Sequence, residues 1–309
     1  MSVTLEIGDQ SFAKTYYQIA NRLTVWPECR VDFACRGLKM GCEVAAALTI
    51  NMQPDGVSIF SCRTHRVVPI KFVLAELCWI LAGSGMLNTI ASYNKAMAHY
   101  SDTPESNIIT SAYGLRLRYQ LPVLVERLKE DIYTRQACAT IYSEYDCLNT
   151  HMTHMPCNVF LQFLCRPPLL DLHVTSRSSD FVTGFSIDTL HWQALLILMA
   201  NELRATGVHV IPNVLHYNIA SLHVYEADCA MVDAWKVEGV REHSLLYEHL
   251  VPLVGNMTLS EAITNCQKNF KADLTLPQLM DVLCMGTEHL TKMIGLDEMF
   301  RLYKNKVIR

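Results

Sequence analysis

The apolar stretches of this chain switch between strand-like alternation and helical spacing without a regular β-α-β rhythm. Apolar runs between turn residues over Val159 to Leu164 and Leu169 to Thr175 predict two paired strands. Helical spacing over Lys71 to Ala82 and Pro122 to Ile132 predicts two helices. Because strands and helices are mixed irregularly, we expect an α+β fold, a layered mixed β-sheet flanked by helices, rather than a Rossmann sheet.

Other segments fill in this pattern. A helix is expected over Gln10 to Thr24, and a long buried helix is expected to start at a cap on Asp188 or Thr189 and to end near Gly207. Further strands, or a strand and its approach, are predicted over Glu43 to Met52, Gly56 to Phe60, Ala137 to Ser143, His209 to Ile211 and Ile219 to Val224. No internal repeat or Gly/Ser linker interrupts the 309 residues, so we expect a single domain over 1–309.

Composition excludes several classes of function. The formal net charge of −4 argues against a broad surface for nucleic acid or membrane. The N-terminal residues carry no secretion signal, and no apolar run is long enough to span a bilayer, so we expect a cytoplasmic protein. The 12 cysteines form no CxxC pair, and we expect mostly buried, reduced thiols.

One of these cysteines stands in a segment suited to chemistry. In MPCNVFLQF, Cys157 follows Pro156 and enters a predicted strand, which would hold the thiol at a rigid edge. A thiolate nucleophile there would need a nearby positive charge or a base to lower its pKa. The alternative interpretation is a buried core thiol, which is the usual state of a free cysteine.

Two further segments offer groups for an anion and a sugar. In SRSSDFVTGFSID, Arg177 and Ser178 supply a guanidinium fork and a hydroxyl that suit a phosphate, although a solvated salt bridge is the ordinary alternative. In SLHVYE, His223 and Tyr225 lie on the same face of a predicted strand and suit a sugar hydroxyl. A half-exposed strand explains that second pair equally well.

A metal site and a nucleotide loop are both weakly supported. The spacing of His151, His154 and Cys157 resembles a partial zinc ligand set, but a fourth ligand is missing and Pro156 opposes a continuous helix. The chain has no GxGxxG or GxxxxGK[ST] sequence. We therefore expect no metal and no dinucleotide or nucleoside-triphosphate loop.

Taken together, the segments resemble the thymidylate synthase superfamily. PCNxxxQF resembles its nucleophile motif, RSSDxxxGxxxD its phosphate-and-base motif, and SLHVY its sugar-binding motif. Upstream, AELCW resembles the helix of the catalytic glutamate, SAYG a tyrosine segment, and CRGLK an early phosphate arginine. The order and spacing agree from about Arg36 to Tyr225, so the resemblance implies a thymidylate synthase-like fold.

The resemblance also implies roles. Cys157 would add to C6 of a pyrimidine, Glu76 would organise water and proton transfers, and Tyr113 would sit by the reacting carbon. The remaining implied contacts are to the 5'-phosphate (Arg36, Arg177, Ser178 and, from the second subunit of a homodimer, Arg135), to the 3'-hydroxyl (His223, Tyr225) and to the co-substrate 5,10-methylenetetrahydrofolate (Asp180, Gly184). Gly184 would allow close backbone approach of the folate ring.

The departures from the superfamily pattern favour a different base. Thymidylate synthases read uracil with an asparagine where this chain has Asp188, and they carry a histidine where it has Asn158. A carboxyl group that accepts from an amino group and shares a proton with N3 matches cytosine, and a site built for one pattern rejects its inverse. The chain is thus most similar to the deoxycytidylate or cytidylate 5-hydroxymethyltransferases, with dCMP the expected substrate and CMP an alternative.

The final partner of the one-carbon unit depends on water. The stretch Ser92 to Asp102 contains no tryptophan, whereas thymidylate synthases use one there to help exclude water. We therefore expect hydration to 5-hydroxymethyl-dCMP, with reduction by the folate to 5-methyl-dCMP as the alternative.

Several readings stay open. Arg135 is followed by Gln136, whereas thymidylate synthases often have two adjacent arginines there. The phosphate would therefore be bound less tightly, or another cation such as Lys39 would compensate. Residues 236–286 carry no motif that indicates a function and are expected to form dimer surface or added helices, and the C-terminal NKVIR would suit a lid.

The other classes of protein that the sequence leaves open are a nucleotide-binding regulator and a zinc-binding structural protein. Either a phage, acting in the host cytoplasm, or a bacterium would be a plausible source.

Overall fold

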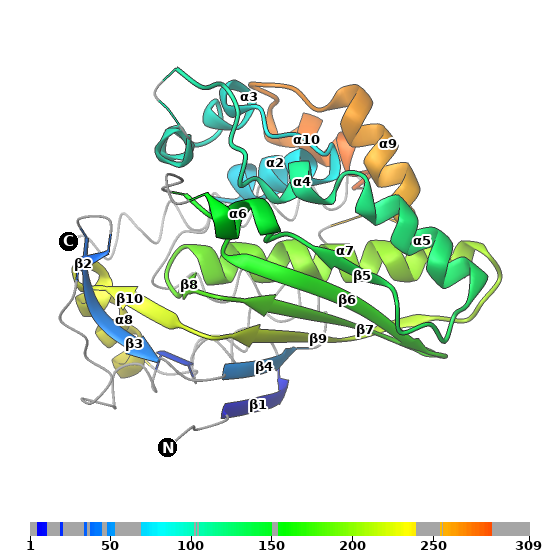
Figure 1. Cartoon of the computed structure of the whole chain (residues 1–309), viewed down its shortest axis with the longest axis horizontal. Helices are drawn as coiled ribbons and strands as arrows, with labels where there is room; N and C mark the ends of the chain where they lie inside the picture. The colour runs from blue at the N-terminus through cyan, green and yellow to red at the C-terminus, as the bar shows by residue number, and fades with distance from the viewer. Residues whose placement is uncertain are drawn as a thin grey trace.

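A six-stranded mixed sheet runs through the protein, with strands from both halves of the chain (Figure 1). The structure is a computed structural model that describes residues 5–10, 19–20, 34–35, 38–44, 48–52, 69–101, 103, 105–149, 154–238, 254 and 256–285.

The strands of this sheet are β1 (Leu5–Gln10), β4 (Leu48–Met52), β5 (Cys138–Thr140), β6 (Asn158–Arg166), β7 (Leu169–Ser176) and β9 (Ile211–Ile219). Their order is β1-β4-β9-β7-β6-β5. Strand β1 runs parallel to β4 and β7 runs parallel to β9, while the other neighbours are antiparallel. This mixture confirms the expected α+β class and the pairing of the two strands predicted between residues 159 and 175.

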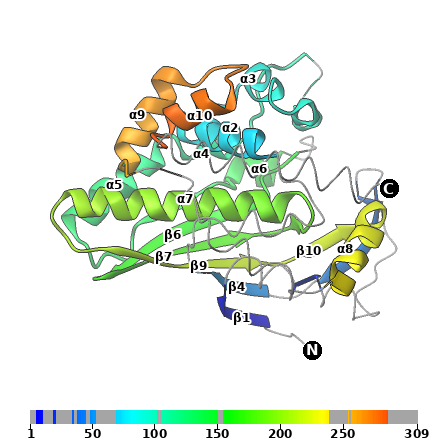
Figure 2. The same cartoon turned by 180° about the vertical axis from the view of Figure 1, so that it is seen from behind.

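A smaller sheet packs beside one end of the large one. It contains β2 (Ala34–Cys35), β3 (Leu38–Val44), β10 (Leu222–Tyr225) and β8 (Ser179–Asp180), in that order. Helix α8 (Glu226–Glu238) contacts β3 and β10, as the view from behind also shows (Figure 2). Strands β9 and β10 are separated by two residues, so the chain passes directly from one sheet to the other.

Helix α7 (Gly184–Ala205) lies along the large sheet (Figures 1 and 2). Its buried residues occur all round the helix, because the sheet covers one side and further helices cover the other. Those helices are α2 (Ile70–Leu81), α5 (Gln120–Glu130) and α9 (Leu259–Asn269), with α10 (Leu276–Val282) packed on α2 and α9. The shorter elements are α3 (Leu87–Ala91), the 3-10 helix η3 (Lys95–Tyr100), α4 (Tyr113–Leu117) and α6 (Glu144–Leu148).

The two faces of the large sheet differ. On β6, Leu161, Phe163 and Cys165 are completely buried toward α7, and the residues between them are only half-buried. Strands β7 and β9 repeat this alternation. In the described part of the chain, the helices other than α8 lie on one side of β6, β7 and β9 (Figures 1 and 2). The residues that alternate with the buried ones on these strands are mostly half-buried.

Some predicted elements differ from the observed ones. Asp188 does not cap the long helix, because α7 begins at Gly184 with Thr183 at the cap position, which places Asp188 one turn inside. Gln10 ends strand β1 instead of opening a helix; residues 19–20 are helical, and the rest of that prediction lies outside the described residues, as does Gly56 to Phe60. The strand expected to end at Ile211 instead begins there and continues to Ile219.

The helices predicted at Lys71 to Ala82 and Pro122 to Ile132 are confirmed as α2 and α5. Between residues 256 and 285, helices α9 and α10 account for part of the segment without a readable motif. Eight cysteines have a side chain that the structure describes, and none of these eight is in a disulfide bond. Only Cys78, Cys165 and Cys266 among them are buried, so the expectation of mostly buried thiols was wrong for this set.

Candidate active site

The candidate nucleophile Cys157 lies where two neighbouring strands open. Strand β6 begins at the next residue, and its partner β7 ends at Ser176. The backbone N–H of Arg177 donates to the carbonyl of Cys157 at 2.9 Å, and the Ser176 hydroxyl donates to the same carbonyl at 3.0 Å. The thiol is half-buried and in no disulfide bond, so the backbone contacts hold this residue in place while its sulfur stays partly accessible.

The guanidinium of Arg177 lies against the segment that carries this thiol. Its Nε donates to the carbonyl of Pro156 at 2.9 Å, and its Nη2 donates to the carbonyl of Met155 at 3.0 Å. The same Nη2 lies 4.0 Å from Cys157 Sγ. A fixed positive charge at this distance favours the thiolate over the thiol, which meets the requirement for a reactive cysteine.

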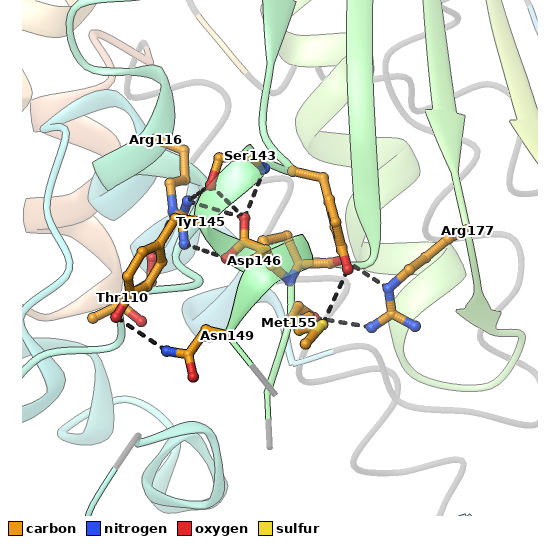
Figure 3. A network of polar contacts seen from close by, with 10 residues as sticks. Thr110, Arg116, Ser143, Tyr145, Asp146, Asn149, Met155 and Arg177 are labelled. Atoms are coloured by element: carbon orange, nitrogen blue, oxygen red, sulfur yellow. Dashed lines mark hydrogen bonds and ion pairs between the residues drawn. The ribbon is translucent and has the colours of Figure 1, made fainter. Parts of the chain in front are cut away.

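A second network anchors the residues just before the nucleophile (Figure 3). Arg116 of α4 makes a bidentate ion pair with the fully buried Asp146 of α6, with N–O distances of 2.7 and 3.1 Å. Asp146 also accepts from the N–H and hydroxyl of Ser143, which caps α6. The Tyr142 hydroxyl contacts Met155 Sδ at 3.1 Å, which ties this strand end to the segment that Arg177 holds.

Two carboxyl groups on neighbouring helices face the site. Burial, followed by the nearby charge of Asp188, raises the pKa of Glu76 on α2 to about 8. Burial also raises the pKa of Asp188 on α7 to about 7, although hydrogen bonds from Asn158, Tyr217 and Tyr113 lower it. Loss of water around two interacting carboxyl groups therefore brings both into the pH range in which they can hold and release protons.

Tyr113 is brought to these carboxyl groups by close helix packing. Its ring stacks on Trp192 of α7 at a centroid distance of 5.8 Å. The next residue is Gly114, where a Cβ atom would lie 2.7 Å from both the Cα and the carbonyl oxygen of Ile80. Only glycine lets α4 approach α2 this closely, so the SAYG sequence places Tyr113 through backbone packing. Burial raises the pKa of Tyr113 well above 10, and its hydroxyl stays protonated.

Asp188 and Asn158 are joined directly. Asn158 Nδ2 donates to Asp188 Oδ2 at 2.9 Å, and the Asn158 side chain is completely buried. The Tyr217 hydroxyl of β9 lies 2.9 Å from Asn158 Oδ1 and 3.4 Å from Asp188 Oδ2. Three polar side chains from β6, α7 and β9 thus form one group immediately beside the nucleophile, in which Asn158 and Tyr217 are fully buried and Asp188 is partly exposed.

The predicted sugar and phosphate residues meet where the small sheet joins. Strand β8 pairs in parallel with β10, with His223 opposite Asp180. Ser178 Oγ lies 3.4 Å from His223 Nδ1, and the rings of His223 and Tyr225 make an edge contact at 5.1 Å. The structure therefore brings the Arg177–Asp180 segment beside the two residues of SLHVY, as the sequence predicted.

The start of α7 carries the residues predicted for the folate. Asp180 accepts from the backbone N–H of Val182 at 3.0 Å and from the hydroxyl of Thr183, so its carboxylate is fixed. Among the described residues, a Cβ on Gly184 would meet only Ser179 Oγ, at an ordinary 3.7 Å. These residues therefore leave space at Gly184, where close approach of a ligand was predicted.

One described phosphate ligand, Arg135, is not brought to this site. Arg36 lies outside the described residues, and the side chain of Lys39 is likewise not described. Arg135 is exposed and precedes β5, and its carbonyl accepts from Gln162 Nε2 at 2.8 Å. Because Cys138 pairs with Gln162, five residues along β6 from Cys157, Arg135 is separated from the thiol by roughly 16 Å or more of strand.

The described residues offer neither a candidate metal site nor a membrane span. They contain no group of three His, Cys, Asp or Glu side chains able to hold a metal ion. His151 of the partial zinc set lies outside them, and His154 makes an edge contact with Tyr100. Within the same part of the chain, no helix is long and apolar enough to cross a membrane.

Sequence reasoning missed Tyr217 and the Arg116–Asp146 pair. Tyr217 alternates with polar residues in VLHYNI, a pattern that indicates an inward-facing strand position without indicating its partner. Ser143 with Asp146 has the spacing of a helix cap, which was a usable local signal. Nothing local links Asp146 to Arg116, which is 30 residues earlier.

The comparisons with known proteins agree with this geometry. Over 190 residues the chain is 36% identical to a deoxyuridylate hydroxymethyltransferase of Bacillus phage SP01, which covers 55% of this chain and 48% of the relative. It is 29% identical over 163 residues to a protein of the same name from Pseudomonas phage M6, covering 50% and 44%. The chain thus spans about half the length of these phage relatives.

More distant relatives point the same way. The chain is 23% identical over 175 residues to a thymidylate synthase of Streptococcus pyogenes serotype M5, covering 54% of this chain and 61% of that protein. The family model for thymidylate synthase matches residues 37–244, which include every candidate site residue except Arg36. This chain belongs to the thymidylate synthase family.

Proposed function

We propose that this chain transfers a one-carbon unit from 5,10-methylenetetrahydrofolate to C5 of a cytosine nucleotide, with dCMP preferred, and that water completes the reaction to 5-hydroxymethyl-dCMP. The observation that carries the proposal is the buried Asp188–Asn158 pair beside Cys157. A carboxyl group with a pKa near 7 can accept from the C4 amino group while it shares a proton with N3. An asparagine in that position would instead offer the pattern that suits uracil.

The proposed reaction begins at the thiol. The Cys157 thiolate, favoured by the Arg177 guanidinium at 4.0 Å, forms a bond to C6 and pushes the C5–C6 electron pair onto C5 and into the ring. The proton that Asp188 shares with N3 stabilises this charge. C5 then bonds to the methylene carbon of the folate and loses its hydrogen as a proton. The bond between that carbon and the folate nitrogen breaks, so tetrahydrofolate leaves with the electron pair and an exocyclic methylene remains on C5. Water adds to this exocyclic carbon. Finally the S–C6 bond breaks, which restores the double bond and the thiolate.

Glu76 and Tyr113 supply proton control in this scheme. Because the pKa of Glu76 is raised to about 8, this carboxyl group is mostly protonated at neutral pH and can donate as well as accept. Tyr113 keeps its hydroxyl proton and faces both Asp188 and Cys157. Both residues would touch the reacting end of the base.

The folate supplies the one-carbon unit at the oxidation level of formaldehyde. The residues at the start of α7 fit such a co-substrate, because the Asp180 carboxylate is fixed and the space at Gly184 is open. Asp180 would bind a donor of the pterin ring, and Gly184 would let the ring approach the backbone. No metal is needed for this chemistry.

Hydration is preferred over reduction for one reason visible in the fold. Tyr100, which lies edge-on to His154 near the nucleophile segment, is 42% exposed. An exposed ring seals this side of a site less well than a buried tryptophan would, and water exclusion is the condition for methyl formation. Reduction to 5-methyl-dCMP is the competing outcome.

A homodimer is part of the proposal. Arg135 is exposed and too far along β6 to reach the Cys157 of its own chain. The face of the large sheet away from α7 carries half-buried residues such as Phe160, Leu164 and Val214 that a second copy could cover. Two chains packed through this face would let Arg135 bind the 5'-phosphate in the partner's site, together with Arg36, Arg177 and Ser178. His223 and Tyr225 would hold the 3'-hydroxyl.

A second candidate function is hydroxymethyl transfer to dUMP. The names of the two phage relatives favour it, because both are deoxyuridylate hydroxymethyltransferases. A protonated carboxyl group offers one donor and one acceptor, as an amide does, so a neutral Asp188 has a possible pairing with uracil. The choice between the two bases therefore depends on where the proton of Asp188 resides.

The proposal is tested by the mass of the product formed from dCMP, CMP and dUMP with methylenetetrahydrofolate. We expect a hydroxymethyl product that forms faster from dCMP than from CMP or dUMP, with no rise in the absorbance of dihydrofolate. A preference for dUMP would replace cytosine with uracil, and dihydrofolate that accumulates with turnover would replace hydration with reduction.

A further inference from the structure

Tyr217 belongs to neither the sequence motifs nor the proposed reaction steps, yet it contacts both residues that would read the base. It lies on β9, completely buried, between Val174 of β7 and Ile50 of β4 in register. Its ring stacks on Phe185 of α7 at a centroid distance of 6.0 Å and an interplanar angle of 6°. The backbone ladder and this stacking hold the phenol in one position.

The phenol has one hydrogen to donate, and its contacts determine where that hydrogen goes. The nearer acceptor is Asn158 Oδ1 at 2.9 Å, compared with Asp188 Oδ2 at 3.4 Å. The amide oxygen of Asn158 can only accept, so a hydrogen bond from Tyr217 fixes which end of the amide faces β9. The other end, Nδ2, then faces Asp188 and donates to Oδ2 at 2.9 Å.

We propose that Tyr217 is a positioning residue that sets the choice of pyrimidine, because it fixes the Asn158 amide and so fixes which oxygen of Asp188 carries the proton. Oδ2 accepts from Asn158 and is kept free of the proton, and the proton of the neutral acid is left to Oδ1. If the amide turned over, its oxygen would face Asp188 and would favour a proton on Oδ2 instead. With the proton on Oδ1 or on Oδ2, the carboxyl group of Asp188 presents its donor and its acceptor to the base in opposite order.

Opposite order means opposite base preference. Cytosine needs a donor toward N3 and an acceptor for the C4 amino group, whereas uracil needs an acceptor for N3–H and a donor toward O4. A carboxylic acid with its proton fixed on one oxygen pairs with only one of these, while an acid with a mobile proton pairs with both. Tyr217 would therefore create discrimination without touching the substrate.

The inference rests on the proposed base-reading role of Asp188, and its test is the ratio of kcat/KM for dCMP to that for dUMP. In Tyr217→Phe we expect this ratio to move toward 1 by roughly tenfold, the size of one lost hydrogen bond. Whichever base the unmodified protein prefers, the ratio moves toward 1 if Tyr217 acts as proposed. If the unmodified protein prefers dUMP, the cytosine assignment is overturned, but the change of the ratio in Tyr217→Phe still tests the role of Tyr217.

A pH profile separates positioning from simple structural damage. The hydrogen bond from Asn158 lowers the pKa of Asp188, so loss of the fixed amide orientation in Tyr217→Phe should move the limb of kcat/KM that reports Asp188 to higher pH. The other titratable groups around Asp188 are Glu76, Tyr113 and Cys157, which are the same in both proteins. An unfolding scan of Tyr217→Phe shows whether the fold is retained.

Tyr93→Phe is the matched control. Its hydroxyl also makes two hydrogen bonds, to the carbonyl of Lys271 at 2.6 Å and from the N–H of Leu274 at 2.8 Å, but it does not contact Asn158 or Asp188. This variant should keep the base ratio and the pH profile. A folded Tyr217→Phe that keeps its base ratio within about twofold would overturn the proposal. Should that variant not fold, Asn158→Ala takes its place, and retention of the ratio there overturns the proposal equally.

Discussion

Asn158 Nδ2 donates a hydrogen bond of 2.9 Å to Asp188 Oδ2, which joins the residue beside the nucleophile to the carboxyl group one turn inside α7. Both residues depart from the thymidylate synthase pattern at the positions proposed to face the base. Their contact links the two departures in one part-buried hydrogen bond, so each departure has a physical reason to accompany the other.

Cys157→Ser should abolish exchange of the C5 hydrogen of the nucleotide with solvent. Exchange requires the S–C6 bond, and a serine hydroxyl beside Arg177 is far harder to ionise than a thiol. Tritium release from C5-labelled dCMP measures this step before any transfer of carbon. Cys147→Ser, at an exposed thiol on α6, is the control and should exchange at the original rate. Undiminished exchange in Cys157→Ser would remove Cys157 from the mechanism.

Glu76→Gln should change how stability depends on pH. The pKa of Glu76 is raised from 4.5 to about 8, so between these pH values the folded protein holds a proton that the unfolded chain has lost. Stability of the unmodified protein therefore falls as pH rises through this range, and the glutamine variant lacks that loss. The free energy of unfolding of the variant, measured relative to that of the unmodified protein, should therefore rise by on the order of a few kcal/mol from pH 5 to pH 9.

Denaturant unfolding at several pH values measures this difference. The same substitution in an Asp188→Asn background should give a smaller gain, because the charge of Asp188 contributes to the raised pKa of Glu76. Stability curves that stay parallel from pH 5 to 9 would show that Glu76 is ionised in the folded protein.

Gly184→Ala and Gly114→Ala should fail in different ways. At Gly184 the new Cβ meets only Ser179 Oγ among the described residues, at 3.7 Å, so the melting temperature should be kept while the KM for the folate rises by roughly tenfold. At Gly114 the new Cβ would lie 2.7 Å from the backbone of Ile80, which should destabilise the fold by about 1–3 kcal/mol. Equal KM values for Gly184→Ala and the unmodified protein would count against a folate site at that residue.

Arg135→Ala should lose activity on its own and regain it when mixed with Cys157→Ser. If Arg135 serves the partner's site, a hybrid dimer has one site with both changes and one site with neither. Random exchange of subunits at equal amounts should restore about a quarter of the original activity. Activity that stays at the sum of the two separate variants after subunit exchange would mean that Arg135 does not act across an interface.

The parts of the fold predicted well are those with a strong local pattern. Helix α2 and the β6–β7 pair have clear spacing of apolar residues, and their bounds differ from the prediction by a few residues at most. Strand β9 was missed between its ends, because Pro212 and Asn213 have low strand propensity and the polar side chains of Asn213 and His216 are only half-buried. The start of α7 was misplaced because glycine is a poor signal for a first helical residue.

The candidate site divides in the same way. Cys157, Arg177 and His223 belong to short segments whose motifs can be read locally, and the structure brings these segments together. The contact of Tyr217 with Asn158 joins residues 59 positions apart, and the pairing of Arg116 with Asp146 joins two helices. Such contacts depend on how the strands and helices pack, which one sequence does not encode in any local pattern.

The most direct test of the cytosine assignment is the base preference of Asp188→Asn. An asparagine in that position offers N3 an acceptor and C4 a donor, which is the uracil pattern. We predict that the unmodified protein has the higher kcat/KM with dCMP and that Asp188→Asn reverses the preference to dUMP, a combined change of at least about 100-fold. A preference for dUMP in the unmodified protein, or a ratio left unchanged by Asp188→Asn, would contradict the claim that Asp188 selects cytosine.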